Sequence, residues 1–147
     1  MIYIGSDHAG FELKNEIYEF VRDELKMDIE DLGCHTKESV DYPDYAKIVC
    51  EKVLKNNGIG ILICGSGLGI SISANKIKGI RCALCSEEYS ASMARKHNNA
   101  NALALGGRVI GAELAKSVVK VFLNTDFEGK NCERHQIRVD KIMALEK

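Results

Sequence analysis

The sequence lacks several features that mark whole classes of protein. No apolar run approaches the roughly 20 residues needed to span a bilayer, and the N-terminus has no signal-peptide pattern. Neither sign of charge dominates, because 20 Lys and Arg residues balance 21 Asp and Glu residues. A near-neutral chain has little attraction for nucleic acids or membrane surfaces. We therefore expect residues 1–147 to form a single soluble, cytoplasmic domain with no nucleic-acid or membrane partner.

Repeats, low-complexity tracts and linkers are also missing, and the single proline, Pro43, marks only a local boundary. The six cysteines form no disulfide or zinc pattern. Cys64, Cys82 and Cys85 lie in apolar, strand-like segments, which suits reduced thiols. Cys82 and Cys85 form a C-x-x-C pair, but residues three apart on a strand point to opposite faces. The sequence thus predicts core cysteines and no metal site.

Strand-like and helix-like segments alternate along the chain. Apolar runs predict strands over residues 1–5, 28–32, 59–64, 79–85 and 101–105. Apolar residues recur at helical spacing after each of these runs, and a last helix is expected from about Asn131. The acidic second run favours an edge strand. This alternation predicts an α/β fold, a three-layer α/β/α sandwich with a Rossmann-like parallel sheet of about five strands and a C-terminal helix.

The central feature is a glycine turn directly after the strand predicted over 59–64. Gly65, Gly67 and Gly69 alternate with other residues there, and a helix is expected over 70–76. Such a turn gathers unpaired backbone N–H groups around one point, which suits a phosphate or a developing oxyanion. The spacing is neither the dinucleotide fingerprint nor a P-loop. The turn therefore indicates a binding site without naming its ligand.

Cys64 ends that strand, where open α/β sheets place their ligands. A helix N-terminus nearby would lower the pKa of its thiol and favour a reactive thiolate. The alternative is a small buried hydrophobe, as most free cysteines are.

Four other side chains have both a structural and a functional interpretation. Asp7 follows the first strand and can cap the next helix, bind a ligand, or do both. His8 is either an exposed loop residue or a phosphate contact, and Tyr42 either a surface aromatic or a wall of the site. His97 can cap a helix C-terminus or act as an acid or base.

The C-terminal helix carries a basic face. Arg134, Arg138 and Lys141 share it at i, i+4 and i+7. A solvated face is the usual outcome, and a phosphate clamp is the alternative, because the arginine fork fits phosphate oxygens.

Seven motifs follow one another along nearly the whole chain. They are Ser-Asp-His-Ala-Gly (6–10), Asp-Tyr-Pro (41–43), Cys-Gly-Ser-Gly-Leu-Gly (64–69), Ala-Asn-Lys (74–76), Arg-Lys-His-Asn (95–98), Gly-Gly-Arg (106–108) and Arg-His-Gln-Ile-Arg (134–138). In this order they resemble the type B ribose-5-phosphate isomerases, a family that also includes galactose-6-phosphate and allose-6-phosphate isomerases. One motif alone would be a weak signal, whereas seven in register are highly specific.

The resemblance implies aldose–ketose isomerisation of ribose 5-phosphate to ribulose 5-phosphate through an enediol, in the non-oxidative branch of the pentose phosphate pathway. It implies no metal and no organic cofactor. Cys64 would be the base, Ser66 would shuttle a proton between the sugar oxygens, and His97 would open the furanose ring. Some family members use a glutamate after the turn instead, but no acidic residue stands between Gly65 and Lys76.

The resemblance also implies the binding residues and the assembly. The N–H groups of Gly65, Gly67, Leu68 and Gly69 would steady the enediolate, with Tyr42 beside them. Asp7 and Asn98 would hold sugar oxygens, and the phosphate would be bound by His8, Arg108, Arg134 and Arg138. A homodimer or homotetramer is implied, with His97, Asn98 and Arg108 supplied by the neighbouring subunit. The alternatives are an isomerase of a six-carbon sugar phosphate and a non-catalytic phosphate- or nucleotide-binding module, with a redox protein using Cys82 and Cys85 disfavoured.

Overall fold

Five parallel strands form one sheet in the computed structural model, which describes residues 1–146. In spatial order they are β2 (Ile29–Asp31), β1 (Ile2–Ser6), β3 (Ile59–Cys64), β5 (Ala102–Gly106) and β4 (Cys82–Leu84). The register opposes Ile63 to Ser6 on one side and Cys64 to Gly106 on the other. The carboxyl ends of β1, β3 and β5 therefore meet at one edge of the sheet.

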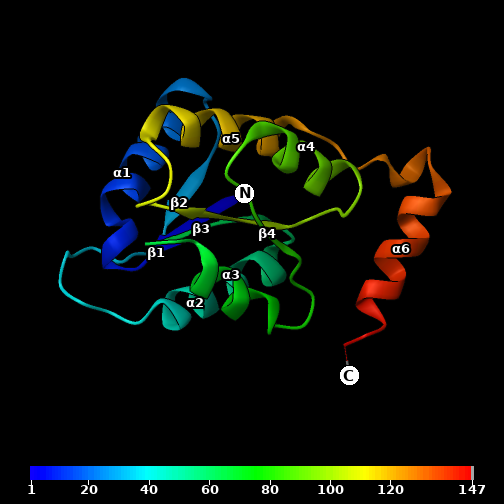
Figure 1. Cartoon of the computed structure of the whole chain (residues 1–147), viewed down its shortest axis with the longest axis horizontal. Coiled ribbons are helices and arrows are strands. Elements are labelled where there is room, and N and C mark those ends of the chain that lie inside the picture. Colours follow the sequence, from blue (N-terminus) through cyan, green and yellow to red (C-terminus); the bar gives the residue numbers. More distant parts are fainter. Residues whose placement is uncertain (147) are drawn as a thin grey trace.

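Helices cover both faces of this sheet. The helical segments are η1 (His8–Gly10), α1 (Phe11–Glu19), η2 (Phe20–Glu24), α2 (Tyr42–Asn56), α3 (Leu68–Asn75), α4 (Glu88–Lys96), α5 (Ala112–Asn124), η3 (Glu128–Lys130) and α6 (Glu133–Met143). Helices α1, α4 and α5 pack on one face, and α2 and α3 pack on the other, whereas α6 stands beside the layers (Figure 1). The predicted three-layer α/β/α fold, its five strands and its C-terminal helix are confirmed.

Alternation along β3 divides the core into two clusters. Ile61 and Ile63 pack towards α1, α4 and α5, while Leu62 and Cys64 pack towards α2 and α3. All four side chains are almost completely buried, and burying an aliphatic side chain contributes about 1.5–3 kcal/mol. Because β3 is buried on both faces, its sequence is a continuous apolar run.

Local chemistry explains where two of the helices begin and end. The carboxylate oxygen Oδ1 of Asp7 accepts hydrogen bonds from the backbone N–H of Ala9 (3.0 Å) and Gly10 (3.1 Å), so Asp7 caps η1. Asn57 ends α2 in the left-handed conformation, with φ of 50°, which asparagine tolerates better than most residues. The cap at Asp7 agrees with the expectation from sequence.

Strand β2 is an edge strand, as predicted, and its acidic end has a definite partner. The fully buried Lys14 of α1 places its Nζ 2.5 Å from Oδ2 of Asp31. The same ammonium donates to the side-chain oxygen of Asn15 at 3.0 Å. A buried lysine is tolerated only when its charge is paired, so this contact fixes α1 against the sheet edge.

The cysteines of the C-x-x-C pair lie on opposite sides of the sheet. Cys85 belongs to the cluster with α4 and α5, and Cys82 packs against the cluster with α2 and α3. They cannot bind one ion together, as the strand setting predicted. In residues 1–146, no helix has the length and apolar character needed to cross a membrane.

Candidate active site

A pocket of about 610 Å³ opens at the carboxyl edge of the sheet. Eight of the residues that sequence reasoning singled out line it: Asp7, His8, Tyr42, Cys64, Gly65, Ser66, Gly69 and Arg108. They follow three neighbouring strands, β1, β3 and β5, or stand at the start of α2. The parallel topology therefore brings together segments that are far apart in the sequence.

The glycine turn wraps around the thiol of Cys64. The backbone N–H of Gly67 donates to Sγ at 3.2 Å, a contact that a thiolate accepts more strongly than a thiol. Gly67 has a φ of 78°, and a Cβ there would lie 2.5 Å from a methyl carbon of Leu84. Only glycine fits this position, so the turn needs Gly67 to bring its N–H to the sulfur.

Some of the turn's backbone N–H groups form hydrogen bonds within the turn, and others have no acceptor. The N–H of Leu68 donates to Oγ of Ser66 at 3.1 Å, so this donor and that of Gly67 are engaged within the turn. Within the described residues, the N–H groups of Gly65 and Ser66 have no backbone acceptor. These two amides, with those of Gly69 and Ile70 in the first turn of α3, are the free donors for an anion. Sequence reasoning, which counted the whole turn, missed this division.

Asp7 and His8 form the wall contributed by β1. Oδ1 of Asp7 is used in capping η1, and its second oxygen remains available to the pocket. Nδ1 of His8 accepts a hydrogen bond from the N–H of Val40 at 3.2 Å. An imidazole that accepts at Nδ1 carries its proton on Nε2, so His8 can donate to a ligand through Nε2.

Two further side chains lie directly over the turn. The ring of Tyr42 covers Gly69 so closely that a Cβ there would lie 2.4 Å from its Cζ. The guanidinium of Arg108 lies beside Gly65, with Nη1 3.4 Å from where a Cβ would stand. The backbone N–H of Arg108 also donates to the carbonyl of Gly65 at 2.9 Å. Arg108 thus lines the pocket of its own chain, and the expectation that a neighbouring subunit supplies it is wrong.

The other predicted site residues occupy different places in the same chain. Gly67 and Leu68 belong to the turn at Cys64, whereas His97, Asn98, Arg134 and Arg138 lie away from it, and none of these six lines the pocket. Helix α4 runs antiparallel to the strands, so His97, which caps its C-terminus, lies at the amino edge of the sheet. That edge is roughly 16 Å from the carboxyl edge, the length of the five-residue strand β5. Asn98 lines a second cavity of about 480 Å³ that α6 helps to enclose.

His97 has a partner that the sequence analysis did not single out. Its ring stacks on that of His135 in α6, with centroids 4.2 Å apart and planes inclined by 14°. Burial lowers the pKa of His135, as do the positive charges of His97, Arg134 and Arg138, against the opposing effect of Glu128. The motif at 134–138, which contains His135, was the one sequence signal that pointed to this residue.

Among the described cysteines, only Cys64 lines the pocket at the carboxyl edge. Burial raises the pKa of Cys50 to about 12 and that of Cys85 to about 11. Burial raises the pKa of Cys82 as well. The raised pKa values keep these three thiols protonated at neutral pH.

Comparison with known proteins identifies the family of this chain. Residues 2–142 match the family described as Ribose/Galactose Isomerase. The chain belongs to this family. A curated member, ribose-5-phosphate isomerase B of Escherichia coli (strain K12), is 48% identical over 99% of this chain and 95% of its own length.

Solved structures of family members have the same fold. Ribose-5-phosphate isomerase B of Clostridium thermocellum aligns with a TM-score of 0.94 and 49% identity, over 99% of this chain and 96% of that one. The Thermotoga maritima protein aligns with a TM-score of 0.92 and 51% identity, over 97% of each chain. The resemblance read from the seven motifs is therefore confirmed at the level of family and fold.

Proposed function

We propose that this family member interconverts ribose 5-phosphate and ribulose 5-phosphate, a step of the non-oxidative branch of the pentose phosphate pathway. One observation carries the proposal: the only thiol in the pocket at the carboxyl edge, Cys64, lies beside free backbone donors and phosphate-compatible side chains. The family contains enzymes named for this reaction. The six cysteines, all unpaired, suit a reducing cytoplasm.

The proposed chemistry is a proton transfer between neighbouring carbons. The thiolate of Cys64 removes the proton from C2 of the open-chain aldose, and the C2–H electron pair becomes the carbon–carbon double bond of an enediolate. The proton then returns from the thiol to C1, while a proton moves between the oxygens on C1 and C2. No atom is gained or lost and no oxidant is needed. A base with a pKa near the working pH suits this task.

Three groups around the sulfur support the other steps. The free N–H groups of Gly65 and Ser66 would stabilise the charge on the enediolate oxygen. The hydroxyl of Ser66 accepts from the N–H of Leu68, which leaves its own proton free to move between the sugar oxygens. The second oxygen of Asp7 is available to bind a sugar hydroxyl.

The phosphate would bind at the end of the pocket formed by His8 and Arg108. Nε2–H of His8 and the guanidinium of Arg108 are donors that suit phosphate oxygens. In the proposal, Arg134 and Arg138 of a neighbouring subunit complete the clamp.

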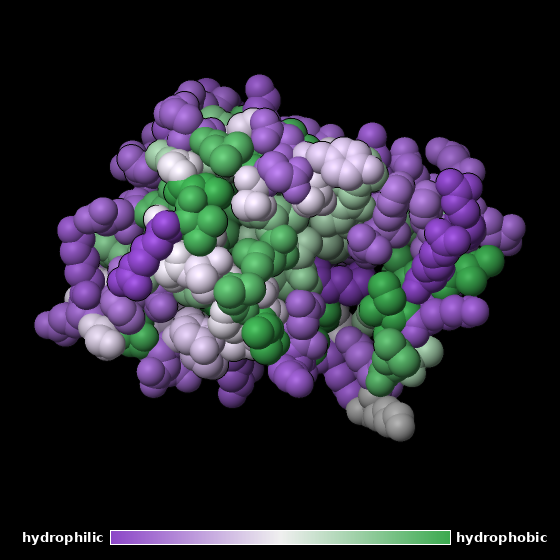
Figure 2. Space-filling model, in the orientation of Figure 1, coloured by the Kyte–Doolittle hydropathy of each residue, from purple (hydrophilic) through white to green (hydrophobic). Residues whose placement is uncertain are grey.

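We propose further that the enzyme is a homodimer or homotetramer with shared sites. His97 lies at the amino edge of its own sheet, too far away to act on a sugar bound at its own Cys64. Large apolar side chains are exposed, including Leu84 and Tyr89, the latter 73% exposed. Figure 2 shows hydrophobic residues over the middle of one face and on the side of α6 that faces the body. Apolar surface of this kind suits a subunit interface, across which His97 and Asn98 would reach the partner's pocket.

The test is conversion of sugar phosphates by the purified protein with EDTA present, followed by NMR. Ribose 5-phosphate should give ribulose 5-phosphate, whereas allose 6-phosphate and galactose 6-phosphate should react more slowly. A preference for either six-carbon substrate would replace the substrate in this proposal. No reaction with any of the three would contradict an isomerase and favour a phosphate-binding module.

A further inference from the structure

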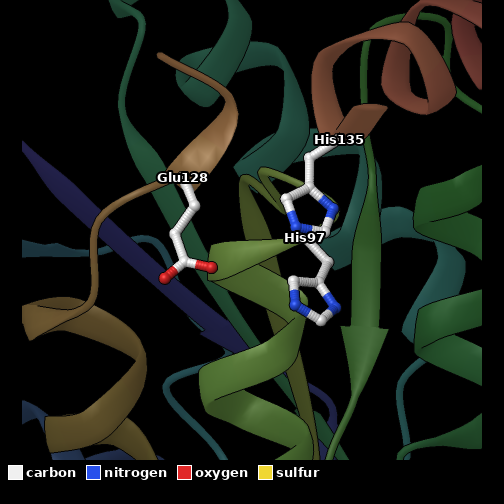
Figure 3. A group of neighbouring side chains, drawn as sticks. All are labelled: His97, Glu128 and His135. Carbon is white, nitrogen blue, oxygen red and sulfur yellow. The ribbon is translucent and has the colours of Figure 1, made fainter. Parts of the chain in front are cut away.

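Three potential metal-ligating side chains meet where α4, η3 and α6 come together (Figure 3). His97 caps the C-terminus of α4, Glu128 begins η3, and His135 lies in the first turn of α6. One ligand atom from each lies within 4.8 Å of the others. The pocket at Cys64 contains none of these three residues.

The backbone around this cluster holds its three elements in a fixed relation. The N–H groups of Asn131 and Cys132 both donate to the carbonyl of Glu128, at 3.0 and 2.9 Å, and so tie η3 to the start of α6. The side chain of Arg95 in α4 donates to the carbonyl of Thr125 at 3.2 Å, just before η3. Coordination of one ion by the three residues therefore requires only rotation of their side chains and no rearrangement of the backbone.

The ligand atoms are free to accept a metal ion. Over residues 1–146, neither imidazole donates or accepts a side-chain hydrogen bond, and the carboxylate of Glu128 forms no ion pair. Ser6 is the one residue in that range with a fully buried side-chain N or O atom lacking a hydrogen-bond partner, so the nitrogens of the two rings still reach solvent. Because the two rings are stacked, they must rotate before their nitrogen lone pairs can point at one ion. Tetrahedral coordination requires the ligand atoms to approach by about 1.5 Å, which the flexible stem of the exposed Glu128 allows.

The chemistry of the donor set selects the kind of ion. Two imidazole nitrogens and one carboxylate oxygen suit Zn²⁺ and the neighbouring transition metals, whereas Mg²⁺ and Ca²⁺ prefer oxygen ligands alone. Three protein ligands also leave a coordination position open, so bound metal can exchange. We propose that His97, Glu128 and His135 form a binding site for a divalent transition-metal ion of the zinc class.

This site has a consequence that rests on the proposed function. A metal ion on His97 occupies the nitrogen that would carry the proton needed for ring opening, so bound zinc inhibits the isomerase. The ion is then an inhibitor and not a cofactor, and EDTA keeps the enzyme active. The sequence analysis expected no metal, from the cysteine pattern and from the family resemblance, and did not consider these three residues together.

Co²⁺ titration of the reduced protein tests the binding site directly, because cobalt reports its ligands by its visible absorption. We expect one tightly bound Co²⁺ per chain, displaced by Zn²⁺, with d–d bands and no thiolate charge-transfer band. Glu128→Gln and His135→Gln should each weaken binding by about tenfold or more. The matched controls Glu133→Gln and His35→Asn change an exposed glutamate and an exposed histidine outside the cluster and should bind as the wild type does.

The outcomes separate the site from the proposed function. Unchanged binding in Glu128→Gln, which alters only an exposed side chain and leaves folding intact, would overturn the metal site. A thiolate band would overturn it too, by showing cysteine ligands. Inhibition of ribose 5-phosphate conversion by Zn²⁺ that is about tenfold weaker in Glu128→Gln would support the inhibitory role. A chain that binds Co²⁺ through these residues but isomerises no sugar phosphate would support the site and overturn the proposed function.

Discussion

Mixing two inactive variants would show whether each active site draws on two subunits. Cys64→Ala removes the proposed base at the carboxyl edge, and His97→Ala removes the proposed ring-opening acid at the amino edge. Each variant alone should lose about 100-fold or more in kcat/KM, the usual contribution of an acid or base. Joint refolding of the two proteins should then restore activity.

The size of the recovery follows from the arrangement of the sites. In a symmetric dimer, an intact site needs Cys64 from one chain and His97 from the other. When equal amounts associate at random, half of the sites receive an intact Cys64, and half of those also receive an intact His97. About one quarter of the wild-type activity should therefore return. The measurement is the initial rate of ribulose 5-phosphate formation at equal total protein, before and after refolding of the mixture.

The structure also supplies a control pair that should not complement. Asp7 and Cys64 line the same pocket of the same chain. Mixing Cys64→Ala with Asp7→Asn therefore leaves every site with one defect, and activity should stay at the average of the separate proteins. Equal recovery in both mixtures, or none in the first, would refute shared sites.

Three other predictions test the site and its surroundings. Iodoacetamide should modify Cys64 selectively and ribose 5-phosphate should protect it, whereas Cys50, whose pKa is about 12, should stay unmodified at neutral pH by mass spectrometry. Gly69→Ala should lower kcat/KM by about tenfold, because the new Cβ would lie 2.4 Å from Cζ of Tyr42; Gly69→Ala combined with Tyr42→Ala should lose nothing further. The pKa of His135 lies below its ordinary 6.5 in the folded protein, so the unfolded chain binds the proton first as pH falls. The free energy of unfolding in urea should therefore decrease as pH falls below 6.5, and less steeply in His135→Gln.

The fold could be predicted largely because parallel strands are buried on both faces. The run from Ile59 to Cys64 is continuously apolar for that reason, and the acidic run that became β2 indicated an edge. The order β2-β1-β3-β5-β4 could not be predicted. It depends on which buried strands pair across long stretches of chain, and their apolar sequences fit many neighbours equally well.

Part of the candidate site could be predicted from the sequence, and part could not. Cys64 and Asp7 were predictable as neighbours because each follows a strand and the carboxyl ends of parallel strands share an edge. The bond from the N–H of Gly67 to the sulfur depends on the exact turn, which spacing does not specify. His135 was missed because attention to a helix's basic face says nothing about the residue buried on the other side.

The most direct test of the account follows hydrogen exchange in deuterium oxide during conversion of ribose 5-phosphate, with EDTA present. The account predicts that the wild type and Cys50→Ala form ribulose 5-phosphate carrying solvent deuterium at C1, and that Cys64→Ala does neither. Product formation with deuterium at C1 in Cys64→Ala would contradict the central claim that Cys64 moves the proton.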